Sequence, residues 1–171
     1  NAEGERVGDY NGCPSCQGAL DVVTENAAKY CKTQYSTNHR YYYWLFDGGD
    51  LCHCEMCRDL NPADQALLFE NAILKGLRQV DSEAILCHLC YHNIIEAPKT
   101  VKPDDGIFLL FAPFFRTWDK PLSDREAKRE GQTISHGDYI GYLESNLAVF
   151  GRLLKLPIEP NSPIAGPTLL M

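Results

Sequence analysis

The chain has 171 residues, 44% of them hydrophobic and 23% charged, and this composition excludes a protein that is disordered throughout. A net charge of −7 argues against a general nucleic-acid coat, because phosphate neutralisation needs a clustered excess of Lys and Arg. The longest apolar run, Ile107 to Phe115, is shorter than the roughly 20 residues of a membrane-spanning helix, so we expect no membrane span.

The N-terminal part begins with a polar, glycine-containing stretch, residues 1–12, which we expect to form an arm. Residues 18–30 follow with the apolar spacing of a short helix. The aromatic run at 41–46 predicts a β-strand, since aromatic residues favour extended structure. A turn at 47–50 then leads the chain into its densest group of cysteines.

The clearest predicted helix begins after Asn61. Asn suits the N-cap, and Pro62 suits the first helical position, where no backbone N–H is needed. Asp64 complements the helix dipole. Glu70 falls inside the apolar stripe of this helix; we expect it at the rim or paired with a cation such as Arg78, because a buried lone carboxylate is costly. The alternative is a functional carboxylate.

The part of the chain after the cysteines predicts a mixed segment of strand and helix. Residues 97–106 look like a connector and residues 107–115 like a buried strand. Capping-box sequences at 123–126 and 135–138 predict a short charged helix and a longer amphipathic one. The proline-rich residues 157–171 preclude a helix and predict an extended tail, which is either disordered or docks on a neighbour.

All eight cysteines lie in the first ninety residues, and six of them form three C-x-x-C pairs. Two residues between cysteines let both sulfurs reach one ion, at about 2.3 Å for zinc. A structural disulfide usually joins distant segments instead, so we predict metal binding, with a secreted disulfide scaffold and an iron–sulfur cluster as the alternatives. The predicted ligands of two zinc ions are Cys13, Cys16, Cys31, Cys52, Cys54, Cys57, Cys87 and Cys90.

Spacing does not decide which cysteines share an ion. In one arrangement the three cysteines within 52–57 bind one ion with Cys31, and the outer pairs at 13–16 and 87–90 bind the other. In a second arrangement the pairs at 54–57 and 87–90 share an ion, and the remaining four cysteines share the other. The reserve ligands are His39, His53, His88 and His92.

The chain contains no phosphate loop, Rossmann glycine pattern, nucleophile elbow or metalloprotease helix. The sequence Ser-His-Gly-Asp at 135–138 has catalytic residue types, but neighbours in sequence rarely form a triad. His53 with Glu55 would suit a catalytic zinc, yet four thiolates close the coordination shell. These patterns favour a protein that is not an enzyme.

Two local patterns support other functions. Basic residues ahead of an aromatic run can hold phosphate and stack bases, which makes a zinc-finger nucleic-acid regulator one alternative; the residues are Lys29, Lys32, His39, Arg40 and the run Tyr41–Trp44. The second pattern is the order Cys13, Cys16, Cys31, His39, Cys54, Cys57, Cys87, Cys90. It resembles the ring-finger type of ubiquitin ligase, although the gaps that flank His39 are wider here, and the resemblance implies a ubiquitin-ligase adaptor.

These elements predict an α+β fold. A small cysteine-rich two-zinc module at 13–96 is followed by a mixed segment at 97–156 that has two amphipathic or charged helices and packs on the module. The preferred function is an interaction or assembly subunit, in which zinc stabilises the fold while exposed aromatic segments and the tail dock partner proteins. Thiolate sites of this kind persist in reducing compartments, so we expect the protein in the cytoplasm, the nucleus or an organelle matrix.

Overall fold

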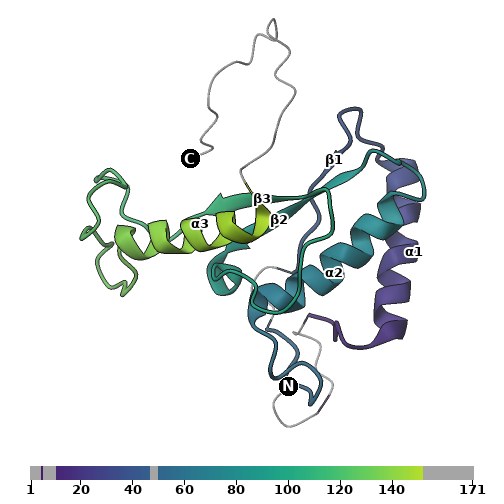
Figure 1. Cartoon of the computed structure of the whole chain (residues 1–171), viewed down its shortest axis with the longest axis horizontal. Coiled ribbons are helices and arrows are strands. Elements are labelled where there is room, and N and C mark those ends of the chain that lie inside the picture. The colour runs from purple at the N-terminus through teal and green to yellow at the C-terminus, as the bar shows by residue number, and fades with distance from the viewer. Residues whose placement is uncertain (1–4, 6–10, 47–49, 152–171) are drawn as a thin grey trace, which may run out of the picture.

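The computed structural model describes residue 5, residues 11–46 and residues 50–151 of the chain (Figure 1). Its three strands form one parallel sheet in the order β1-β2-β3. The expected mixture of helices and strands is therefore confirmed, but the parallel sheet makes the fold a mixed α/β one. The elements are α1 (Gln17–Thr33), β1 (Arg40–Tyr41), α2 (Pro62–Leu77), β2 (Ile85–Tyr91), the short 3-10 helix η1 (His92–Ile94), β3 (Ile107–Ala112) and α3 (His136–Phe150).

Helix α2 begins where the sequence predicts. The Asn61 side chain accepts a hydrogen bond from the backbone N–H of Asp64 at 2.8 Å, and Pro62 occupies the first helical position. Asp64 is fully buried, and its Oδ1 accepts three further bonds, of 2.7 to 3.0 Å, from the successive backbone N–H groups of residues 99–101. The helix cap thus also anchors the connector that leads to β3.

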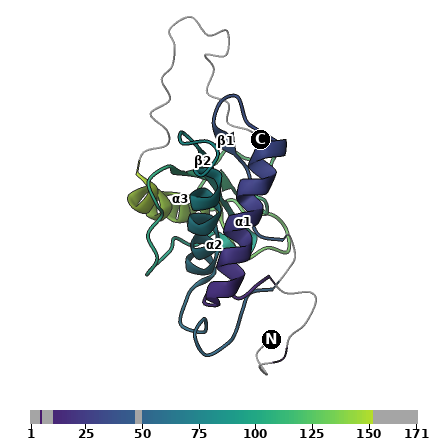
Figure 2. The same cartoon turned by 90° about the vertical axis from the view of Figure 1, so that its right-hand side faces the viewer.

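All three helices lie on one face of the sheet. Tyr41, Leu86 and Ile107, one residue from each strand, share a buried cluster with residues of α1 and α2. Farther along the strands, Leu109 packs with Tyr139 of α3 in a second cluster. In Figures 1 and 2, α1 and α2 run side by side while α3 lies across β2 and β3. The core therefore sits between the helices and this one face.

The crossing of α1 and α2 requires a glycine. A Cβ atom on Gly76 would lie 2.2 Å from the backbone oxygen of Thr24 and 2.9 Å from the Cβ of Ala27. We expect Gly76→Ala to lower the free energy of unfolding by about 1–3 kcal/mol, measured by urea denaturation, because the two helices must move apart. Gly141→Ala in α3 is the matched control, since its Cβ would meet nothing within 4 Å. An unchanged urea midpoint for Gly76→Ala would contradict this packing.

Several elements differ from those the sequence predicts. Residues 123–130 form turns and one bridge instead of a short helix. Of the strand expected at 41–46, only Tyr41 lies in a strand, β1. The sequence analysis did not predict β2 as a strand. The tail at 157–171 and most of the arm at 1–12 lie outside the described residues.

The predicted boundary between the cysteine-rich module and the following segment falls between β2 and β3. These two strands pair from Leu86 with Ile107 to Tyr91 with Ala112. The division into domains stays a prediction. Among the described residues, no helix combines the length and the apolar character that crossing a membrane requires.

Candidate metal centre

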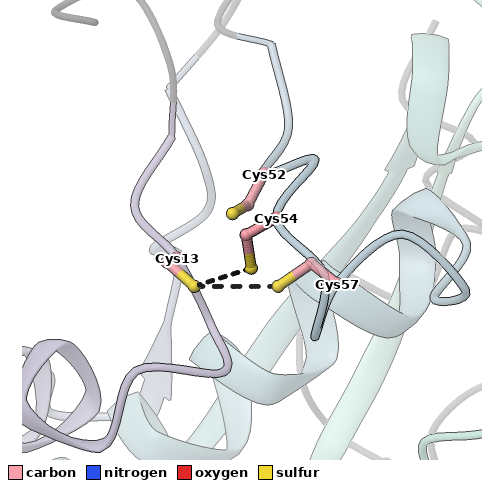
Figure 3. Close-up of side chains that lie close together, drawn as sticks. All are labelled: Cys13, Cys52, Cys54 and Cys57. Carbon is pink, nitrogen blue, oxygen red and sulfur yellow. Dashed lines mark hydrogen bonds between the residues drawn. The ribbon is translucent and has the colours of Figure 1, made fainter. Parts of the chain in front are cut away.

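Four of the predicted ligands form one cluster: Cys13, Cys52, Cys54 and Cys57 (Figure 3). Their sulfur atoms all lie within 4.8 Å of one another. Cys13 Sγ lies 3.7 Å from Cys54 Sγ and from Cys57 Sγ. Four sulfurs placed tetrahedrally about 2.3 Å from a zinc ion stand about 3.8 Å apart, whereas a disulfide bond is about 2.05 Å long. The cluster could therefore hold a single metal ion.

Two segments distant in the chain meet at the cluster. Residues Cys54 to Cys57 form a tight turn in which the Cys57 backbone N–H donates to the Cys54 carbonyl at 2.9 Å. The segment that carries Cys13 is tied to this loop where the Asn11 backbone N–H donates to the Asp50 carbonyl at 2.8 Å. The C-x-x-C pair at 54–57 thus adopts the knuckle that its spacing predicts.

Two side chains outside the cluster hold its loop in place. Gln65, buried in the first turn of α2, accepts the backbone N–H of Cys52 at 3.1 Å and donates to the carbonyls of Cys52 and Cys57 at 3.0 and 3.3 Å. Ser15 Oγ lies 3.1 Å from Cys57 Sγ. Such supporting bonds orient metal ligands. Neither residue was expected from the sequence, where closeness to the cysteines is the only signal for them.

The pKa values of the thiols in the cluster are shifted in different directions. Burial and then the hydrogen bond with Cys52 raise the pKa of Cys13 to about 12. Burial also raises the pKa of Cys57. At Cys54 burial acts in the same direction, but hydrogen bonds from the other three thiols outweigh it and lower the pKa to about 7. The metal-free cluster therefore favours a thiolate at Cys54, which is the form that binds metal.

The other four predicted ligands lie outside this cluster. Cys16 is exposed just before α1, and Cys31 is buried in α1 with its sulfur 3.2 Å from Tyr41 Oη. Cys87 and Cys90 are buried in β2, where residues three apart point to opposite faces. Burial raises the pKa of both thiols to about 12. A second metal site is not shown among the described residues, which include all eight cysteines.

The side chains considered for catalysis already have partners. His53 Nε2 lies 3.5 Å from a carboxylate oxygen of Asp50, and Glu55 pairs with Arg58 at 3.2 Å. His136 is buried, with its ring nitrogens 3.0 and 3.2 Å from backbone carbonyls. Its neighbours in the sequence form the capping box of α3, as expected.

The residues of the predicted nucleic-acid patch are not all exposed. Tyr41 is buried, and its hydroxyl donates to Asp81 Oδ2 at 2.9 Å. His39 Nδ1 lies 2.8 Å from the other oxygen of Asp81. Tyr42 and Trp44 are exposed. Nucleic-acid binding stays a prediction, with Tyr42 and Trp44 as the rings that bases could reach.

A buried hydrogen bond between Glu70 and His88 is the main feature that sequence reasoning missed. Glu70 of α2 is 1% exposed, and its Oε2 lies 2.7 Å from Nδ1 of His88, which is fully buried in β2. The His88 ring also stacks on Phe150 of α3, with ring centroids 4.8 Å apart. Glu70 thus lies neither at the rim nor beside Arg78, and its partner comes from the strand beneath it.

The fold and the cluster together define a mixed α/β protein with one four-cysteine site that could bind a metal such as zinc. Comparison with protein-family models, with curated proteins and with solved structures finds no match. Function is therefore inferred from the geometry of the chain itself.

Proposed function

We propose that this protein is a zinc-stabilised, non-enzymatic subunit that docks partner proteins. The observation that supports the proposal best is the cluster of four sulfur atoms within 4.8 Å of one another. Four thiolates around a tetrahedral ion are a ligand set of structural zinc sites. Because all four positions would be filled by the protein, the ion would have no open position for a substrate or an activated water.

The position of the cluster explains what the ion would contribute. Cys13 lies just before α1, and the other three ligands lie in the loop just before α2. These two helices pack on each other and carry much of the buried core. One ion would therefore tie the starts of the two helices together, and zinc binding of this kind contributes folding free energy.

Exposed aromatic side chains support the docking role. Monomeric proteins rarely expose large contiguous apolar patches, and aromatic residues are enriched in interfaces. The exposed rings belong to Tyr30, Tyr35, Tyr42, Trp44, Phe46, Phe114 and Trp118.

The state of the cysteines bears on the compartment. None of the eight cysteines is in a disulfide, which agrees with the reducing compartment that we propose.

Elemental analysis of the purified chain tests the metal. We expect one zinc per chain, and we expect Cys54→Ser to lose it, because three thiolates and a hydroxyl bind zinc far more weakly than four thiolates. Cys16→Ser is the matched control, since Cys16 is exposed and lies outside the cluster.

Three other results of this measurement would contradict or change the proposal. A chain without metal, or one loaded with iron, would remove the basis of the proposal. Equal loss of zinc from both variants would show that the described cluster is not the binding site. Two zinc ions per chain would restore the second site predicted from the sequence.

A further inference from the structure

The thiols of the four-cysteine cluster differ in how easily an oxidant can reach them. Cys13 and Cys54 are partly exposed, whereas Cys57 is fully buried. Figure 3 shows the sulfur of Cys13 facing those of Cys54 and Cys57, and each of the two lies 3.7 Å from it. Of these two partners, Cys54 is the one that solvent reaches. An accessible thiol that stands beside a second thiol is the kind that forms a disulfide on oxidation.

A disulfide between Cys13 and Cys54 would join two segments that are distant in the chain. The two residues are 41 positions apart, whereas a bond between Cys54 and Cys57 would stay within one tight turn. A longer closed loop removes more entropy from the unfolded chain, which favours the long-range bond as the product. The backbone hydrogen bond of 2.8 Å from Asn11 to Asp50 already holds the two segments together, so the remaining approach of the sulfurs falls to the side chains.

We propose that a peroxide switches the cluster from a zinc site to a Cys13–Cys54 disulfide. The bond would leave Cys52 and Cys57 as the remaining thiolates of the cluster, and a structural zinc site takes four protein ligands. Oxidation would therefore release the ion, while the new bond ties together the same two segments that the ion joined. The inference rests on the proposed function and deepens it by naming how the metal site is regulated.

The oxidation balances with one hydrogen peroxide for each disulfide. The first thiolate of the pair attacks a peroxide oxygen, the O–O bond breaks, and the sulfur becomes a sulfenic acid while the leaving hydroxide takes up a proton as water. The second sulfur then attacks the first. The S–S bond forms, the S–O bond breaks, and the departing hydroxide leaves as a second water with a proton from that thiol, or from solvent where zinc has displaced it. A thiol reductant reverses the reaction through a mixed disulfide, after which zinc can bind again.

Brief treatment of the zinc-loaded full chain with equimolar hydrogen peroxide tests the switch. We expect the intact mass under denaturing, non-reducing conditions to fall by two hydrogens, a peptide map to link Cys13 with Cys54, and one zinc to be released per disulfide into a chromogenic indicator. Dithiothreitol with added zinc should restore both the mass and the metal. Cys16→Ser is the matched control: Cys16 is the C-x-x-C partner of Cys13 but lies outside the cluster, so this variant should form the same bond and release zinc equally.

A bond from Cys13 to any cysteine other than Cys54 would overturn the inference. So would oxidation that leaves the zinc bound, or added oxygen atoms without a linked peptide. Zinc content is measured on the untreated chain as well. One zinc per chain that peroxide does not release would reject the switch and leave the proposed function standing, whereas a Cys13–Cys54 bond in a chain that never holds zinc would reject the metal site and, with it, the regulation inferred here.

Discussion

Replacing Glu70 by leucine is expected to lower the free energy of unfolding by about 1–3 kcal/mol, because it leaves the buried Nδ1 of His88 without its hydrogen-bond partner. Glu70 Oε2 lies 2.7 Å from His88 Nδ1, and both side chains are shielded from water by α2, β2 and the ring of Phe150. His88 Nε2 has no hydrogen-bond partner among the described residues. Leucine would leave Nδ1 unpaired as well, so the imidazole would be buried with neither nitrogen bonded.

A double-mutant cycle measures the pair itself. His88→Leu should also destabilise the protein, because it leaves the buried carboxyl group of Glu70 without a hydrogen-bond partner. The double variant removes both polar groups and replaces them with apolar ones of similar size. We therefore expect its loss of unfolding free energy to be smaller than the sum of the two single losses by about 1–3 kcal/mol. Urea denaturation of the four proteins at pH 7 gives the coupling. Additive losses would show that the two side chains do not stabilise each other.

Local signals in the sequence were sufficient for the helix starts. Asn61 with Asp64, and Ser135 with Asp138, each form the capping box that their spacing predicts. A cap depends only on residues within one turn, so no knowledge of the rest of the fold is needed. The capping-box sequence at 123–126 shows the limit of this reasoning, because no apolar face follows it and the segment forms turns instead.

The cysteines show what spacing cannot decide. The pairs at 54–57 and 87–90 have the same C-x-x-C form, yet the first lies in a tight turn and the second in β2. In a strand, side chains three residues apart leave opposite faces, so Cys87 and Cys90 cannot form a knuckle. The run Ile85–Tyr91 is also nearly all apolar, which is typical of a parallel strand buried in a sheet.

The fourth member of the cluster depends on tertiary structure. Spacing groups Cys52, Cys54 and Cys57, and the structure does bring them together. Their neighbour is Cys13, whereas Cys31, the partner expected in one arrangement, lies inside α1 beside Tyr41. The crossing of α1 and α2 sets this choice, and it rests on contacts such as Gly76 with Thr24 that no local pattern encodes.

Removing zinc is expected to loosen the cysteine loop while the sheet persists. At a free zinc concentration about 1,000 times the dissociation constant, the ion would contribute about 4 kcal/mol to stability. The four ligands do not belong to the two buried clusters of the core. In hydrogen exchange after chelation, the backbone amides of Cys57, Arg58 and Leu60 should lose protection, while those of β2 keep it. Loss of protection in β2 as well would mean that the whole fold depends on the ion.

The pKa values of the thiols fix how zinc binding responds to pH. At pH 8 the Cys54 thiol, with a pKa of about 7, is largely ionised, whereas Cys13, with a pKa of about 12, and Cys57, whose pKa is also raised, keep their protons. Zinc must displace those protons, so at least two should be released per ion, one from Cys13 and one from Cys57. The metal-free form gains protons as the pH falls, and zinc affinity must therefore fall with it. A pH-indicator dye in weakly buffered protein measures the release, and a value near zero would mean that these thiols are not the ligands.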